Sequence, residues 1–249
     1  MKGIVLAGGY GTRLYPFTRY MSKHLLPVYD KAMVCYPLQT LRLADITEVL
    51  LITTTPDVAR YQNLLGDGEL WGMHITYMEQ PTPQGIASAF LLAENFIGDS
   101  SVCLILGDNI FHAKKLRHQL LAIKQVIEDE NNIIDAVVLA TLTQEPQRYG
   151  IVRYDEQRRP IAIIEKPAKP PSNHAVTGLY FYANNVLEIA KNLTPSARGE
   201  LEITDVNQYY LQQQRLMIEY LKEGAVWFDC GTHTALAEAS QFFQQLSAR

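Results

Sequence analysis

The sequence predicts an α/β protein, built as a Rossmann-like three-layer α/β/α sandwich around a mixed, mostly parallel central sheet. Three observations support this class. Short apolar runs with the character of buried strands alternate with helical patterns, the order found in parallel, doubly wound sheets. A glycine-rich loop follows the first run, where binding loops of such sheets lie. Hydrophobic residues make up 47% of the 249 residues, enough for a substantial core.

The first half of the chain contains apolar runs separated by helical patterns. We predict strands over residues 2–6, 49–54, 75–80 and 101–108. We predict helices over residues 37–44, 58–65, 85–97 and 115–130. Right-handed crossovers bring the carboxyl ends of the strands to one edge of the sheet, where ligands bind.

The pattern changes after a further apolar run at residues 133–142. Strand-like segments follow over residues 148–155, 159–167, 175–183 and 225–232. Helical patterns lie at residues 184–193, 201–214 and 235–246. We find no internal repeat or linker, so we expect a single domain over residues 1–249 whose second half adds a substrate-binding layer.

Composition and charge exclude several classes of protein. There are 22 basic and 26 acidic residues, a net charge of -4, and no basic run that could follow a nucleic-acid backbone. The three cysteines, Cys35, Cys103 and Cys230, form no CxxC pair, so a reduced, cytoplasmic setting fits best. We expect no signal peptide, because glycines interrupt the first apolar run, and no membrane span.

The loop GGYGTR after the first strand has three interpretations. It lacks the Lys-Ser/Thr of a P-loop, and Leu14 replaces the third glycine of a dinucleotide fingerprint, although Asp30 lies at a suitable distance for one. It could also be a tight strand exit without a ligand. Arg13 favours a triphosphate site, because a guanidinium beside free amides suits phosphate. Lys23 in SKHLLPV is a surface lysine or a second phosphate clamp.

Two aspartates stand out because they follow apolar strands. Asp108 in LGDN could be a helix cap or turn residue, and Asp229 in WFDCGT could serve in capping or hydrogen bonding. Together with a triphosphate loop, two carboxylates at strand ends favour a shared magnesium ion. His174 and His233 have no partner at ligand or triad spacing, so we interpret them as structural.

These motifs resemble those of the sugar-1-phosphate nucleotidyltransferases, and most closely the glucose-1-phosphate thymidylyltransferases. The similarity runs in order along nearly the whole chain: LAGGYGTRLYP, SKHLLPVYDK, LLGDG, LGDNIF, RYGIV, EKP, AVTGLYFY, PSARGELEITD and WFDCGTH. It implies the nucleotidyltransferase fold, with a nucleotide-binding half over about 1–110 and a sugar-phosphate-binding half over about 111–249.

The resemblance implies the roles of individual residues. Arg13, Lys23 and Asp108 are the expected catalytic residues, and Asp108 and Asp229 are the expected Mg²⁺ ligands. The expected nucleotide site comprises Leu6, Gly8, Gly9, Gly11, Thr12, Arg13, Lys23, His24, Gln80, Gly85 and Asp108. The expected sugar-phosphate site comprises Asn109, Gly150, Glu165, Lys166, Val176 and Arg198.

Some of these roles have a chemical reason or an alternative. Gln80 could pair with the edge of a pyrimidine, and Gly85 is expected to open space for its ring. Glu165 and Lys166 could form only an exposed ion pair. Arg198 could be satisfied by nearby acidic residues instead of a sugar phosphate. His24 departs from the glutamine of the longer thymidylyltransferases, although it could still hydrogen-bond the nucleotide.

The implied reaction joins dTTP and α-D-glucose 1-phosphate to give dTDP-glucose and pyrophosphate, in deoxysugar and rhamnose precursor synthesis. Alternatives are a uridylyltransferase, a related sugar-1-phosphate enzyme, or a non-catalytic sugar-nucleotide-binding regulatory subunit. The chain resembles short forms without the C-terminal extension, and residues 112–115 depart from the regulatory stretch of the longer enzymes. We therefore expect dTDP-rhamnose to inhibit weakly and competitively, and we expect a homo-oligomer, with a tetramer favoured by the resemblance.

Overall fold

The computed structural model describes residues 1–248. Residue 249, the last residue of the predicted single domain, lies outside the described residues. The described chain divides into two compact units. The glycine-loop unit comprises residues 2–83, 104–117 and 224–248, and the central unit comprises residue 1 and residues 84–103 and 118–223. This division differs from the expected halves at residue 1 and in the segments 84–103, 111–117 and 224–248.

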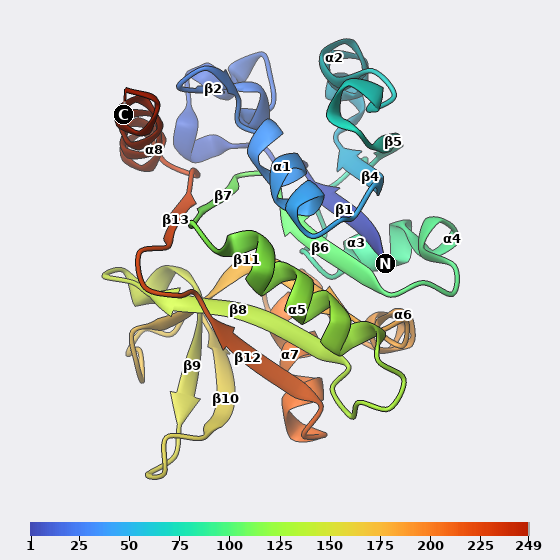
Figure 1. Ribbon diagram of the computed structural model, residues 1–249, viewed down its shortest axis with the longest axis vertical. Helices are drawn as coiled ribbons and strands as arrows, with labels where there is room; N and C mark the ends of the chain where they lie inside the picture. The colour runs from blue at the N-terminus through green and yellow to red at the C-terminus, as the bar shows by residue number, and fades with distance from the viewer. Residues whose placement is uncertain (249) are drawn as a thin grey trace. The chain divides into compact units, whose positions relative to one another are not determined.

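Parallel strands form the core of the glycine-loop unit. Strands β1 (Lys2–Leu6), β4 (Glu48–Thr53) and β5 (His74–Glu79) pair in parallel, and residues 104–106 of β6 (Val102–Leu106) continue the sheet beside β1. The other elements of this unit are β2 (Pro27–Val28), β3 (Lys31–Ala32), β7 (Asn109–His112), β13 (Val226–Asp229), α1 (Cys35–Leu43), α2 (Val58–Leu65) and α8 (His233–Ser247) (Figure 1).

The burial of the parallel strands agrees with their sequence. Five consecutive residues of β4, from Val49 to Thr53, are buried, as expected for a strand covered on both faces. Helix α8 packs on the edge of the unit, where Phe242 and Phe243 contact the ring of His112 at centroid distances of 5.5 and 6.1 Å. These contacts partly cover the end of β7, where His112 is half-buried.

Antiparallel pairing dominates the central unit. Strand β11 (His174–Tyr182) pairs antiparallel with β8 (Ala136–Leu142) and β9 (Gly150–Tyr154), and β9 pairs antiparallel with β10 (Pro160–Glu165). Strand β12 (Leu216–Tyr220) lies parallel to β8, so the pairing is mixed. The helices are α3 (Ser88–Leu92), α4 (Glu94–Ile97), α5 (Leu116–Glu128, mostly in this unit), α6 (Val186–Lys191) and α7 (Ile203–Gln212). Strands β9 and β10 form the long yellow hairpin in Figure 1.

The predicted α/β class, with a mixed, mostly parallel sheet and flanking helices, is confirmed. The predicted helix at residues 85–97 begins later and is divided into α3 and α4 at Ala93, because Gly85 has a φ of +94° and Ala93 leaves helical geometry. The strands β7 and β12 were not expected from the sequence. Among the described residues, no helix combines the length and apolar composition needed to cross a membrane.

Candidate active site

The glycine loop leaves β1 and turns into a single turn of 3₁₀ helix at Thr12–Leu14. Gly11 adopts a φ of +59°, and a β-carbon there would lie 2.9 Å from Cγ2 of Thr18. Only glycine satisfies both the left-handed conformation and this close approach. A compact loop of this kind can present its backbone amides to an anion.

Gln80 lies beside the start of the loop. A β-carbon on Gly8 would be 2.7 Å from Oε1 of Gln80, so the amide side chain faces the loop directly. Gln80 is buried, and its backbone N–H donates to Thr53 at the end of the neighbouring strand β4. The structure thus brings together two of the predicted nucleotide-binding residues that are 72 positions apart in the sequence.

Lys23 and Asp108 form a close ion pair. Nζ of Lys23 lies 2.5 Å from Oδ2 of Asp108, and Nδ2 of Asn109 donates to Oδ1 of the same carboxylate at 3.1 Å. Burial by itself would raise the pKa of Asp108, but the charge of Lys23 and these hydrogen bonds outweigh it and hold the pKa well below its usual range. Asp108 is therefore ionised at neutral pH.

Asp229 is held next to this pair by strand pairing. Strands β7 and β13 pair antiparallel so that Asp229 is opposite Asn109, and the N–H of Cys230 donates to the carbonyl of Asp108 at 2.9 Å. Two carboxylates therefore lie at the ends of adjacent chain segments. Arg13 completes the cluster, since its Nη2 would lie 2.6 Å from a β-carbon on Gly231, two residues after Asp229.

The two aspartates fit a magnesium site. Magnesium in phosphate-transferring enzymes takes one or two carboxylates and fills its remaining positions with water and substrate phosphates. Within residues 1–248 no group of three or more His, Cys, Asp or Glu side chains could hold a metal by itself. A site made by Asp108 and Asp229 therefore needs phosphate oxygens, as a nucleotide triphosphate would supply.

Asn109 has a different environment from that expected of a sugar-phosphate ligand. Its side chain is 2% exposed, its Nδ2 donates to Asp108, and its Oδ1 accepts from the indole of Trp227 at 2.6 Å. The amide thus spans the β7–β13 pair and supports the Asp108 carboxylate.

His24 is also turned into the protein. Its ring is 1% exposed, and Nδ1 lies 3.0 Å from Oγ of Ser22. Burial, with a smaller contribution from the charge of Lys23, lowers the pKa of His24 to about 3, so the ring is neutral. The remaining predicted nucleotide residues of this unit, Leu6, Gly9 and Thr12, lie at the end of β1 and in the glycine loop.

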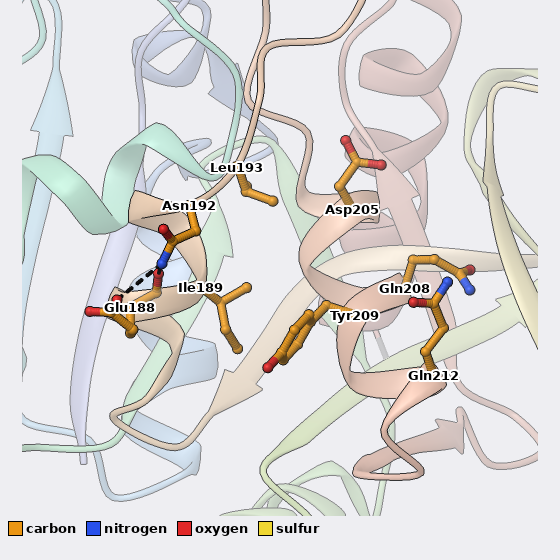
Figure 2. A pocket seen from close by; sticks show the side chains of 8 residues that line it. All are labelled: Glu188, Ile189, Asn192, Leu193, Asp205, Gln208, Tyr209 and Gln212. Atoms are coloured by element: carbon orange, nitrogen blue, oxygen red, sulfur yellow. Dashed lines mark hydrogen bonds between the residues drawn. The ribbon is translucent and has the colours of Figure 1, made fainter.

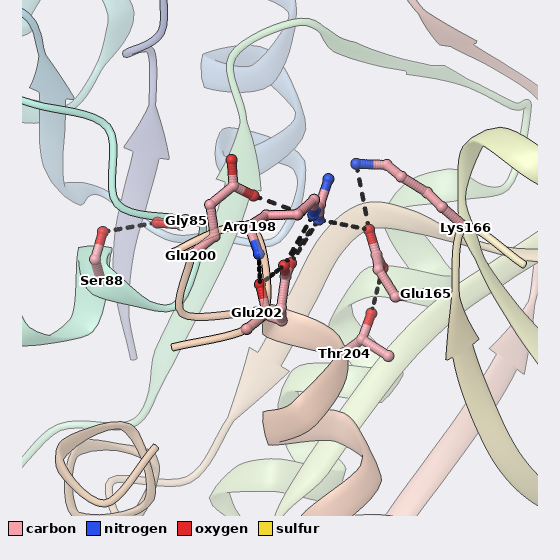
Figure 3. A network of polar contacts seen from close by, with 9 residues as sticks. Gly85, Ser88, Glu165, Lys166, Arg198, Glu200, Glu202 and Thr204 are labelled. Atoms are coloured by element: carbon pink, nitrogen blue, oxygen red, sulfur yellow. Dashed lines mark hydrogen bonds and ion pairs between the residues drawn. The ribbon is translucent and has the colours of Figure 1, made fainter. Parts of the chain in front are cut away.

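Glu165 is the centre of the predicted sugar-phosphate residues in the central unit. It pairs with Gly150 across the β9–β10 hairpin, and its Oε2 accepts from the hydroxyl of Thr204 at 2.6 Å. Nζ of Lys166 lies 3.3 Å from Oε1 of Glu165 (Figure 3). Val176 lies on β11 opposite Ala140 of β8 and is buried.

Arg198 is surrounded by carboxylates. Its Nη2 lies 2.8 and 2.9 Å from the two oxygens of Glu202, 3.3 Å from Glu200 and 3.4 Å from Glu165 (Figure 3). Glu202 is buried, whereas the Arg198 side chain is 43% exposed. The guanidinium is therefore fixed at one end by a buried carboxylate and accessible at the other, which allows it to contact an anion.

Gly85 packs against the chain that follows Arg198. A β-carbon there would lie 2.6 Å from the backbone nitrogen of Leu201, and the N–H of Leu201 donates to the carbonyl of Gln84 at 2.8 Å. The expected reason for a glycine, space for a base ring, is thus not the one that the structure shows. Gly85 is required for backbone contact with the Arg198–Glu202 segment.

A separate cavity of about 380 Å³ lies between α6 and α7 of the central unit (Figure 2). Asp205, Tyr209 and the amides of Asn192, Gln208 and Gln212 are among its lining residues. Burial, followed by the charges of Glu202 and Glu165, raises the pKa of Asp205. None of the predicted site residues lines this cavity.

His174 and His233 have structural surroundings, as expected. His174 contacts the rings of Tyr154 and Tyr220, and Nε2 of His233 lies 3.2 Å from the carbonyl oxygen of Tyr15.

Sequence reasoning missed several polar side chains that organise both groups of residues. Ser22 contacts His24 directly, and Tyr61 contacts it through the Ser22 hydroxyl. In the central unit, Thr204 hydrogen-bonds to Glu165 and Glu202 hydrogen-bonds to Arg198. Glu202 and Thr204 stand within the quoted segment PSARGELEITD, so their position in a motif was an available signal. Tyr61 lies in an ordinary helical pattern, and nothing in its local sequence distinguishes it.

Comparison with known proteins places the chain in one family. The chain matches the family model described as "Nucleotidyl transferase" over residues 2–245. It is 50% identical over 244 residues to the glucose-1-phosphate thymidylyltransferase of Neisseria meningitidis serogroup A, covering 98% of this chain and 83% of that protein. It is 47% identical over 249 residues to the protein of the same name from Mycobacterium tuberculosis, covering 84% of that protein.

Solved structures agree with this relationship. A Bacillus anthracis protein of the same named class, solved in complex with a sucrose, superposes with a TM-score of 0.87 at 39% identity and covers 97% of this chain and 94% of its own. A UDP-glucose pyrophosphorylase complexed with UDP-glucose superposes with a TM-score of 0.83 at 23% identity, covering 98% of both chains, which shows a shared fold. The chain therefore belongs to the nucleotidyl transferase family and, within it, to the glucose-1-phosphate thymidylyltransferases.

Proposed function

We propose that this protein transfers a thymidylyl group from dTTP to α-D-glucose 1-phosphate, releasing pyrophosphate and forming dTDP-glucose. The observation that carries the proposal is the ion pair of Lys23 with the ionised Asp108, beside a glycine loop and a second aspartate. This arrangement suits a polyphosphate, and the name shared by the relatives supplies the two substrates.

The reaction needs no protein nucleophile. An oxygen of the sugar phosphate attacks the α-phosphorus of dTTP, and the bond from that phosphorus to the bridging oxygen of pyrophosphate breaks. Catalysis then depends on alignment and charge neutralisation. In this proposal Arg13 stabilises the departing pyrophosphate, and Lys23 contacts the phosphates.

We propose Mg²⁺ as the cofactor, held by Asp108 and Asp229. When bound, the ion supplies positive charge beside the phosphate oxygens. Lys23 neutralises the Asp108 carboxylate in this structure, and its ammonium would share that carboxylate with a bound ion.

In the central unit, we propose that Glu165 accepts hydrogen bonds from sugar hydroxyls. Lys166 and Arg198 bind the phosphate of glucose 1-phosphate. Thr204 holds the Glu165 carboxylate through Oε2, while Oε1 lies 3.3 Å from Nζ of Lys166 and 3.4 Å from Nη2 of Arg198. The exposed side of the Arg198 guanidinium is the side available to an anion.

The test is a pyrophosphate-release assay with dTTP, UTP, ATP and GTP against a panel of sugar 1-phosphates, with and without Mg²⁺. We expect the highest kcat/KM with dTTP and glucose 1-phosphate, UTP as a weaker substrate, and no turnover after chelation. A methyl group in a pocket changes the transition-state free energy by about 1–3 kcal/mol. The kcat/KM for UTP should therefore be lower than that for dTTP by about tenfold or more. A preference for a purine nucleotide would overturn the proposal.

Three further expectations belong to this proposal. The protein is expected to be a homo-oligomer, with a tetramer favoured by the family resemblance, which light scattering on the purified protein would measure. A cytoplasmic location is supported by the three free, buried cysteines. We also expect the product to serve as a precursor of deoxysugars and rhamnose.

A further inference from the structure

Three hydrogen-bonding groups and the ring of His24 form a continuous chain inside the glycine-loop unit. The hydroxyl of Tyr61 on α2 donates to Oγ of Ser22 at 2.9 Å, and Oγ of Ser22 lies 3.0 Å from Nδ1 of His24. The backbone carbonyl of Ala7, at the start of the glycine loop, accepts a hydrogen bond from the same ring. All three side chains are buried.

The proton positions in this chain follow from counting donors and acceptors. Oγ of Ser22 accepts from Tyr61 and from the backbone N–H of His24 at 3.4 Å, so its single proton is left for Nδ1. Nδ1 is therefore an acceptor, and Nε2 carries the proton of the neutral ring. Because the ring is 1% exposed, neither nitrogen is open to a nucleotide.

The ring also packs against the turn after β6 that carries the proposed catalytic carboxylate. A β-carbon on Gly107 would lie 2.7 Å from Cδ2 of His24, so the imidazole contacts the backbone immediately before Asp108. The carbonyl of His24 accepts from the N–H of Val34 at 2.9 Å, which holds the other side of the segment. One ring thus joins the Lys23 segment to the glycine loop and to the end of β6.

We infer that His24 is a positioning residue of the transferase site, locked as the Nε2–H tautomer by Tyr61, Ser22 and Ala7, and that it holds Lys23 opposite Asp108 instead of binding the nucleotide.

The first experiment observes the ring directly and does not depend on the substrates. Long-range ¹H–¹⁵N NMR of the wild-type protein should show an unprotonated Nδ1 and a protonated Nε2 for His24, both before and after addition of dTTP. Tyr61→Phe should weaken the hydrogen bond to Nδ1 and shift that resonance. A proton on Nδ1 in the free protein, or a change of tautomer on binding dTTP, would overturn the inference.

The second experiment rests on the proposed thymidylyl transfer and measures coupling to Lys23. His24→Phe should lower kcat about 10–100-fold, since small misplacement of a catalytic group can cost 10²-fold, with a change of less than about threefold in the KM for dTTP. In a Lys23→Met background the same substitution should cost less than about threefold, because it acts through Lys23. His74→Phe, at an exposed position on β5, is the matched control and should have wild-type rates.

Two results of these kinetics would contradict the positioning role. One is an equal loss of kcat in the wild-type and Lys23→Met backgrounds. The other is a raised KM for dTTP at unchanged kcat, which would indicate a direct nucleotide contact. Melting curves identify variants that fail to fold, and for those the NMR result on the wild-type protein decides. If no activity is found with any nucleotide, the NMR experiment still tests the hydrogen-bond chain while the proposed function fails.

Discussion

Nζ of Lys23 and Oδ2 of Asp108 lie 2.5 Å apart although the two residues are 85 positions apart in the sequence. The pair combines the cation expected to contact phosphate with the carboxylate expected to bind Mg²⁺. The Lys23 ammonium and the Asp108 carboxylate therefore neutralise each other in this structure.

Removing either partner of this pair should reduce turnover without unfolding the protein. We expect Lys23→Met and Asp108→Asn each to lower kcat about 10²–10³-fold, the usual cost of one preorganised electrostatic contact. Steady-state kinetics at saturating substrates measure the loss. Lys115→Met, at an exposed lysine, is the matched control, and near-wild-type turnover in Lys23→Met would remove this lysine from the mechanism.

Arg13→Ala should also lower kcat about 10²–10³-fold. The guanidinium packs beside Asp229 and Gly231, where it can reach a departing pyrophosphate. Inhibition by pyrophosphate offers a second measurement, because weaker binding of the leaving group should raise its inhibition constant. Arg60→Ala, on the exposed face of α2, serves as the control. Unchanged pyrophosphate inhibition in Arg13→Ala would contradict the assigned contact.

Glu202→Gln should weaken the use of glucose 1-phosphate more than that of dTTP. The buried carboxylate fixes Arg198 through two oxygens and is itself fixed by Ser196, whose hydroxyl donates at 2.7 Å. Without the Glu202 carboxylate the Arg198 guanidinium is less firmly held, so its hydrogen bond to the sugar phosphate weakens. A hydrogen bond to a charged group is worth about 1.5–3 kcal/mol, so KM for the sugar phosphate should rise about tenfold or more. Glu200→Gln, at an exposed carboxylate of the same cluster, should raise it far less. Equal effects on both KM values would argue against this role.

Gly85→Ala should destabilise the protein more than Gly98→Ala. Both glycines have positive φ values, +94° and +56°, which costs a non-glycine residue about 1–2 kcal/mol. Only at Gly85 does an added β-carbon meet backbone, and overpacking adds about 1–3 kcal/mol. Urea unfolding would give both free energies. Equal losses of unfolding free energy in the two variants would show that the Leu201 segment shifts to accommodate the added methyl group.

The three cysteine thiols should react slowly in the folded protein. Burial raises the pKa of Cys35 to about 11 and raises the pKa values of Cys103 and Cys230 as well, so little thiolate exists at pH 8. We expect all three thiols to react with DTNB within seconds in denaturant and over hours without it. Fast labelling of one cysteine in the native protein would reveal local opening around it.

The sequence alone determined the elements that long periodic patterns specify. The alternation of apolar runs and helices predicted β1, β4, β5, β6 and α2 within a residue or two of their observed bounds. The strands β7 and β12 were missed, because short strands depend on pairing with distant segments more than on their own composition. The glycine loop, Arg13, Lys23 and both aspartates were recognisable because their chemistry requires those residue types next to strand ends.

Only the tertiary structure decided which partner each polar side chain has. His24, Asn109 and Gly85 were all expected to face a ligand, yet the structure places them against Ser22, Trp227 and Leu201. The physical reason is that a buried polar group must be hydrogen-bonded, and its partner comes from whichever segment packs against it. That choice depends on contacts between residues tens of positions apart, which local sequence patterns do not contain.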